Sequence, residues 1–132
     1  GLFRLPACWQ HQVRMGIGSD VGAGTTFSML RTLGEAYKVG QLQSYRLRAS
    51  EAFYHATLGG AHALRLDDKI GNFAAGKEAD FVVIDPAVTP LQRLRIGRCH
   101  DIYEQLFVLM TLGDERNISE TWVNGERVWC QD

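Results

Sequence analysis

Asp20 stands at the end of a short alternating segment and directly before a glycine-rich turn. In this segment the apolar residues Val13, Met15 and Ile17 occupy every second position, which predicts a β-strand. After the turn, apolar residues recur three and four positions apart, and this spacing predicts one face of a helix. We therefore expect a βα unit with a carboxylate at the carboxyl end of its strand, which in a (β/α) barrel is the functional rim.

The local pattern leaves two roles open for Asp20. An aspartate that follows a strand commonly forms a turn or caps the next helix, because its short side chain accepts hydrogen bonds from nearby backbone N–H groups. The alternative is a chemical role for the carboxylate at the rim. The helix face that follows is formed by Phe27, Leu30, Leu33 and Tyr37.

Several further segments are similar to parts of one known family. Residues 18–25 (GSDVGAGT) with 33–38 (LGEAYK), then 51–61 and 106–114, resemble guanine deaminases of the metal-dependent amidohydrolase superfamily. The block GKEAD at residues 76–80 resembles the superfamily more broadly. The resemblance extends almost to the last residue, but it concerns only the C-terminal portion of such an enzyme.

The resemblance implies an α/β fold in two parts. Residues 1–66 are expected to be a C-terminal fragment of a (β/α)8 metal-dependent hydrolase barrel, with its last βα unit and the helices that follow. Residues 67–132 are expected to supply strands of a small β-sandwich domain, together with one helix.

The resemblance also implies the chemistry, which is hydrolysis of guanine to xanthine and ammonia by a zinc-activated water. Asp20 matches the family's aspartate at the end of the last barrel strand, so it is the expected metal ligand and catalytic proton carrier. Zinc lowers the pKa of a bound water toward neutrality, and a carboxylate beside it can move the proton. The family's histidine ligands and glutamate are not matched in this chain. A single carboxylate holds zinc weakly, so we expect the chain alone to bind no zinc and to be inactive.

Two other functions remain open at this stage. The GKEAD block fits another amidohydrolase equally well, such as a chlorohydrolase or a different aminohydrolase. The helices and the C-terminal hairpin also suit a non-catalytic assembly module.

Other motifs in the chain do not complete a site. Residues 71–77 follow most of the phosphate-loop pattern, but Glu78 replaces the required Ser or Thr and the segment leads into a strand. The four histidines show no metal-ligand spacing, although His55 could approach the barrel rim in a complete enzyme.

Composition excludes some partners. The 132 residues have a formal net charge of -1, which gives no electrostatic case for nucleic acid or for an anionic membrane.

The three cysteines are far apart, so a reducing, cytoplasmic compartment is expected. The chain starts at Gly1 and its first methionine is Met15, so we interpret it as trimmed or as a piece of a longer reading frame.

Local signals predict the remaining elements. Asn124-Gly125 between two apolar segments is typical of a type I′ hairpin. Because a barrel strand and its helices would lack neighbours, we expect exposed apolar faces and self-association. The expected elements are a helix over 5–11, a helix after Thr26 that runs to about Val39, a helix capped by Ser50, a strand over 81–84, and a helix capped by Asp101 and ended by Gly113.

Overall fold

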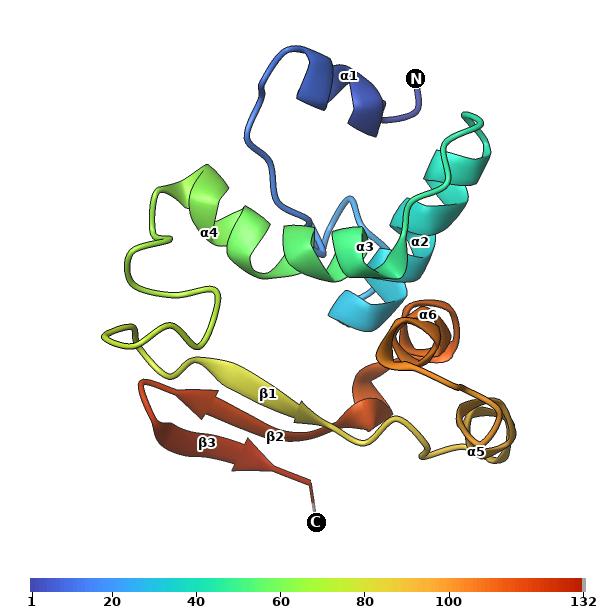
Figure 1. The fold of residues 1–132 in the computed structure, drawn as a ribbon, viewed down its shortest axis with the longest axis vertical. Helices are drawn as coiled ribbons and strands as arrows, with labels where there is room; N and C mark the ends of the chain where they lie inside the picture. Colours follow the sequence, from blue (N-terminus) through green and yellow to red (C-terminus); the bar gives the residue numbers. More distant parts are fainter. Residues whose placement is uncertain (132) are drawn as a thin grey trace.

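Helices form one side of the molecule and a small sheet forms the other (Figure 1). The computed structural model describes residues 1–131. The helices are α1 (Leu5–Gln10), α2 (Met29–Gln41), α3 (Ala49–Ala56), α4 (Leu58–Leu64), α5 (Pro90–Ile96), α6 (Ile102–Leu112) and the 3-10 turn η1 (Glu115–Asn117). The strands are β1 (Phe81–Ile84), β2 (Ile118–Val123) and β3 (Glu126–Cys130).

The core lies where α2, α3 and α6 meet. Leu33 of α2, Ala52 of α3 and Met110 of α6 are almost fully buried there, together with Leu47 from the loop before α3. The predicted helix after Thr26 is confirmed, and it starts at Met29 because the Ser28 side chain accepts a hydrogen bond from the Arg31 N–H. Helix α6 has the predicted Asp101 cap and ends at Gly113.

Helices α3 and α4 run end to end as one rod with a break at Thr57 (Figure 1). The predicted cap at Ser50 is wrong, because α3 already begins at Ala49 and Arg48 is in the cap position. The Glu51 side chain, three residues after the cap, folds back and accepts the Arg48 N–H at 3.0 Å, so it satisfies the backbone donor of the cap residue itself.

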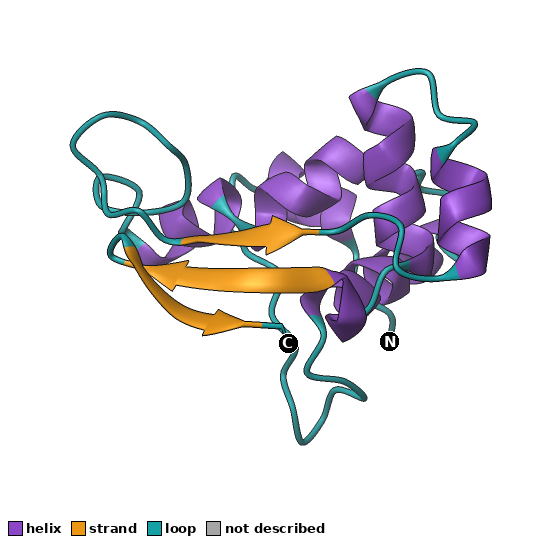
Figure 2. Ribbon diagram, turned by 90° about the horizontal axis from the view of Figure 1, so that it is seen from below, coloured by secondary structure: helices purple, strands orange, loops and turns teal. Residues whose placement is uncertain are grey.

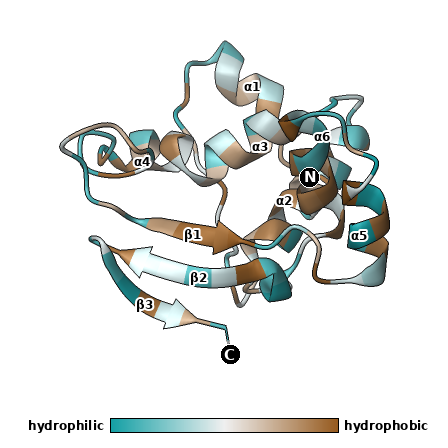
Figure 3. Cartoon of the chain, turned by 60° about the horizontal axis from the view of Figure 1, so that its bottom comes forward, coloured by the Kyte–Doolittle hydropathy of each residue, from teal (hydrophilic) through white to brown (hydrophobic). Residues whose placement is uncertain are grey.

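The sheet is antiparallel with strand order β1-β2-β3 (Figure 2). The predicted hairpin is confirmed: Asn124 and Gly125 both have positive φ, 49° and 78°, as a type I′ turn requires. Phe81 of β1 pairs with Trp122 of β2, and their rings stack with centroids 5.4 Å apart. The apolar strand β1 stands out in Figure 3, whereas β2 is more polar in its middle.

The predicted strand over residues 13–17 is not formed as a strand in the described chain. A strand is stabilised by ladder hydrogen bonds to a neighbour, and this segment has no neighbouring strand among residues 1–131. The side chains still alternate in their exposure to solvent: Met15, Ile17 and Ser19 are half-buried, while the residues between them are exposed. The chain is therefore a mixed helix and strand fold whose only described sheet is antiparallel.

The expected loss of packing partners is wrong for most of the α2 face. Leu30 and Leu33 are buried, Leu33 completely, because α6 and α3 pack against α2. Phe27 precedes the helix and is 84% exposed, as expected of an uncovered side chain. Tyr37 is partly buried and meets Phe107 of α6 edge to face at 5.5 Å.

Helix α6 packs on helices that come much earlier in the chain. The predicted division into residues 1–66 and 67–132 stays a prediction, and Asp132 lies outside the described residues. Within residues 1–131, no helix has both the length and the apolar character needed to cross a membrane.

Candidate functional site

Asp20 occupies a tight turn with a left-handed backbone, φ 47°. Its carbonyl oxygen accepts hydrogen bonds from the N–H groups of Ala23 at 3.1 Å and Gly24 at 2.5 Å. The residue is exposed, and its carboxylate makes no hydrogen bond or ion pair within the described part of the chain. Asp20 therefore forms the turn through its backbone, which leaves its carboxylate free for another role.

Zinc does not fit the residues that this chain provides. Across residues 1–131, no three His, Cys, Asp or Glu side chains gather closely enough to hold a metal ion. His62 pairs with Asp67 at 3.0 Å, and His55 is buried in α3, so neither joins Asp20 in a ligand set. Asp20 alone supplies one ligand, fewer than the three or four that protein zinc sites use.

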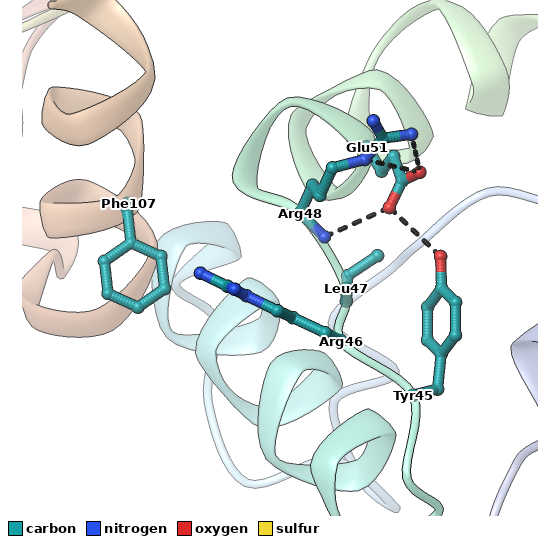
Figure 4. Close-up of a pocket in the computed structure, with 6 residues that line it drawn as sticks. All are labelled: Tyr45, Arg46, Leu47, Arg48, Glu51 and Phe107. Atoms are coloured by element: carbon teal, nitrogen blue, oxygen red, sulfur yellow. Dashed lines mark hydrogen bonds and ion pairs between the residues drawn. The ribbon is translucent and has the colours of Figure 1, made fainter.

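A second site is the open hollow between α3, the loop before it and α6 (Figure 4). It has a volume of about 620 Å³ and is lined by Tyr45, Arg46, Leu47, Arg48, Glu51 and Phe107. The Glu51 carboxylate accepts hydrogen bonds from the Arg48 guanidinium at 2.6 and 3.0 Å and from the Tyr45 hydroxyl at 3.0 Å. One local signal of this cluster is visible in the sequence: Arg48 and Glu51 stand three residues apart at the start of a helix.

The charges in this hollow shift the titration of its groups. Burial raises the pKa of Tyr45 to about 12, and the hydrogen bond to the Glu51 carboxylate and its negative charge act in the same direction. Burial alone would raise the pKa of Glu51, but hydrogen bonds from Arg48 and Tyr45 outweigh it and lower that pKa. In the described chain Arg46 forms no ion pair, so its charge is not neutralised locally.

Two buried amides that the sequence analysis did not identify join the sheet to the helices. Gln92 of α5 donates to the Leu112 carbonyl at 2.8 Å and to the Asn117 side chain at 3.0 Å. Asn117 in turn donates to the Asp85 carbonyl at 2.7 Å and accepts the Asp114 N–H at 3.0 Å. Helix α5 itself was not predicted, although Thr89-Pro90 followed by Gln92 is a capping signal.

Comparison with known proteins gives a consistent family. The model of the amidohydrolase family matches residues 1–128. The chain is 61% identical over 129 residues to the guanine deaminase of Escherichia coli (strain K12), covering 98% of this chain and 29% of that protein. The solved structure of the E. coli enzyme matches with a TM-score of 0.97 and 60% identity, over 100% of this chain and 31% of that one.

More distant solved structures share the same fold. A guanine deaminase from C. acetobutylicum with guanine bound in its active site has a TM-score of 0.79 and 26% identity, over 98% of this chain and 30% of that one. A zinc-bound adenosine deaminase from Xanthomonas campestris has a TM-score of 0.74 and 27% identity, over 96% of this chain and 28% of that one. This chain thus spans less than a third of the length of each of these proteins. The match over residues 1–128 nevertheless establishes that the chain belongs to the amidohydrolase family.

Proposed function

We propose that this chain forms the C-terminal portion of a guanine deaminase, which hydrolyses guanine to xanthine and ammonia. The observation that supports this most strongly is the 61% identity to the E. coli guanine deaminase over 98% of the chain. Three cysteines that are all free fit a reducing, cytoplasmic location for this enzyme.

Within that enzyme, residues 13–20 are proposed to be the last strand of a (β/α)8 barrel, with α2 as the helix that follows. The alternating exposure of residues 14–20 supports this, because a barrel strand turns successive side chains to opposite faces. The sheet of β1, β2 and β3 is proposed to be part of a small β-sandwich domain. Its outer strands β1 and β3 each have one unpaired edge in the described chain, where further strands can add.

The proposed role of Asp20 is metal ligation and proton transfer. Its exposed carboxylate, free of any partner in residues 1–131, suits both tasks. Residues 1–131 do not provide the remaining metal ligands, so we infer that these come from a part of the enzyme outside this sequence. The 132-residue chain by itself is then expected to retain no zinc and to release no ammonia from guanine.

The runner-up function is deamination of another purine or a related heterocycle. The zinc-bound adenosine deaminase from X. campestris, at 27% identity, is the observation that favours it. The two functions differ in substrate, so a complete enzyme that includes this sequence should be assayed with guanine, adenine and adenosine side by side.

The decisive experiment measures ammonia release by that complete enzyme and its variants. Asp20→Ala and Asp20→Asn should each lower kcat by about 10²–10⁴-fold, because neither side chain can accept the proton. Asp68→Asn is the matched control, since Asp68 is also exposed and outside the site, and it should leave kcat unchanged. Near-normal turnover in an Asp20 variant would remove its assigned role, and higher turnover with adenosine than with guanine would favour the runner-up.

A further inference from the structure

His55 is a buried histidine whose side chain has no hydrogen-bond partner among residues 1–131. It belongs to α3 and is 6% exposed, and its Nδ1 atom makes no hydrogen bond within the described residues. Its ring instead contacts two aromatic rings, Trp9 with the centroids 6.1 Å apart and Tyr54 with the centroids 5.2 Å apart. The imidazole thus contacts its surroundings here as a flat ring, since its buried Nδ1 atom contributes no hydrogen bond.

The segment that leads to Asp20 is attached to His55 at two points. Before the segment, Trp9 of α1 stacks on the His55 ring with an interplanar angle of 21°. Near its end, the N–H of Ile17 donates to the His55 backbone carbonyl at 2.9 Å. No ladder hydrogen bonds hold residues 13–17 in the described chain, so these two contacts limit how far the segment can move, together with the Val13 N–H bond to the Cys8 carbonyl at 2.8 Å and the close approach of Gly16 to Gly60.

The position of the Asp20 carboxylate depends on that attachment. Its side chain has no hydrogen bond of its own in residues 1–131, so the backbone alone directs it. The backbone at Asp20 is fixed on one side by the turn to Ala23 and Gly24, and on the other by the segment that contacts His55. A shift of the segment therefore moves the carboxylate.

We propose that His55 is a positioning residue, which holds residues 13–20 through its ring stack with Trp9 and its carbonyl bond to Ile17 and thereby sets the place of the Asp20 carboxylate. The effect of His55 on catalysis rests on the proposed function. Its restraint of residues 13–20 does not, and it can be measured on the 132-residue chain. A misplacement of a reacting group by about 1 Å can lower a rate about 100-fold.

The structural test is hydrogen exchange on the 132-residue chain, followed in peptides that cover residues 13–20. His55→Ala removes the ring and should speed exchange at the Ile17 amide at least about tenfold. His55→Phe keeps a flat ring that can contact Trp9 and Tyr54, so it should retain the protection. His62→Ala is the matched histidine control, because His62 lies in α4 and pairs with Asp67. Val108→Ala controls for a general loss of core packing, since Val108 is buried in α6.

The catalytic test uses the complete enzyme with guanine as substrate. We expect His55→Ala to lower kcat at least about tenfold with KM changed less than about threefold, and His55→Phe to restore kcat. Three outcomes would each overturn the proposal. The first is an unchanged exchange rate at Ile17 in His55→Ala, and the second is an equal acceleration of that exchange in Val108→Ala. The third is a His55→Phe variant whose exchange protection and kcat are as low as those of His55→Ala. If Asp20→Ala proves fully active, the proposed function fails instead, and the exchange experiment alone decides the structural role of His55.

Discussion

The backbone of Gly16 lies directly against that of Gly60 in α4. A methyl group added to Gly16 would come within 2.7 Å of the Gly60 Cα atom and 3.4 Å of the His55 carbonyl oxygen. Contacts below about 3 Å between such carbons are repulsive, so Gly16 leaves no room for a side chain without movement of the backbone. The close approach brings the segment before Asp20 against the rod formed by α3 and α4.

Gly16→Ala should therefore destabilise the chain by about 1–3 kcal/mol, because the added methyl group must push backbone away from backbone. Urea unfolding followed by circular dichroism measures the change in the free energy of unfolding. Gly18→Ala is the matched control: a Cβ there meets nothing within 4 Å and φ is not positive, so it should be neutral or slightly stabilising. Equal stability of the two variants would contradict the close packing.

Elements with strong local signals were predictable from the sequence. Asn124-Gly125 requires positive φ at two residues, and few alternatives to a hairpin satisfy it. Asp101 and Gly113 likewise marked the ends of α6. The absence of strand pairing at residues 13–17 of the described chain was not predictable. Alternation indicates which side chains share a face of the backbone, but it does not indicate whether a neighbouring strand is present.

The site was only partly predictable for a related reason. The position of Asp20 after an alternating segment was readable from the sequence, but the hydrogen bond that joins this segment to His55, through the Ile17 N–H, links residues far apart in the chain. The burial of His55 and the Gln92–Asn117 pair arise from tertiary packing, which local periodicity does not encode.

Asn117→Ala should destabilise the chain by about 2–3 kcal/mol. Asn117 is fully buried, and its loss leaves the Asp114 N–H and the Asp85 carbonyl without this partner. The measurement is again the free energy of unfolding in urea. Thr111→Ala removes an exposed hydroxyl that bonds to its own helix and should change stability by less than about 0.5 kcal/mol. A similar, small effect for both variants would show that the buried amide network contributes little.

Tyr45 should ionise at a higher pH than an ordinary tyrosine, with a pKa of about 12. Ultraviolet difference absorbance of the phenolate reports this titration, and Tyr45→Phe identifies which step belongs to it. Glu51→Gln keeps a hydrogen-bond acceptor but removes the negative charge, so it should lower the pKa of Tyr45. Because that pKa is raised in the folded chain, the associated stability is complete below about pH 10 and is lost as the pH rises through about 12. An unchanged Tyr45 titration in Glu51→Gln would contradict the contribution of the Glu51 charge and leave burial as the sole cause.

Asp114 should make the chain sensitive to acid. Hydrogen bonds from the Arg116 guanidinium, the largest cause, lower the pKa of Asp114, and Arg31 contributes through an ion pair at 3.6 Å. A lowered folded pKa stabilises the chain above the unfolded pKa of about 3.9, and this stabilisation is lost as the pH falls through the folded value. Asp114→Asn should thus reduce stability at pH 7 and flatten its dependence on pH below about 4. Identical acid unfolding curves for the variant and the parent chain would contradict this.

The last prediction concerns association of the chain with itself. Several large apolar side chains stay exposed, among them Phe73 at 79%, Val13 at 53% and Trp129 at 47%, besides Phe27. Covering each such side chain is worth about 1.5–3 kcal/mol, and the unpaired edges of β1 and β3 offer backbone groups for pairing. We therefore expect the 132-residue chain to form dimers or larger species at micromolar concentration in analytical ultracentrifugation. Phe27→Ser combined with Phe73→Ser should shift the distribution toward monomer, whereas Leu33→Ala, a buried change, should lower stability without that shift. If the chain stays a cooperatively folded monomer over the whole concentration range, its exposed apolar side chains remain solvated without a partner. The prediction of self-association would then be wrong.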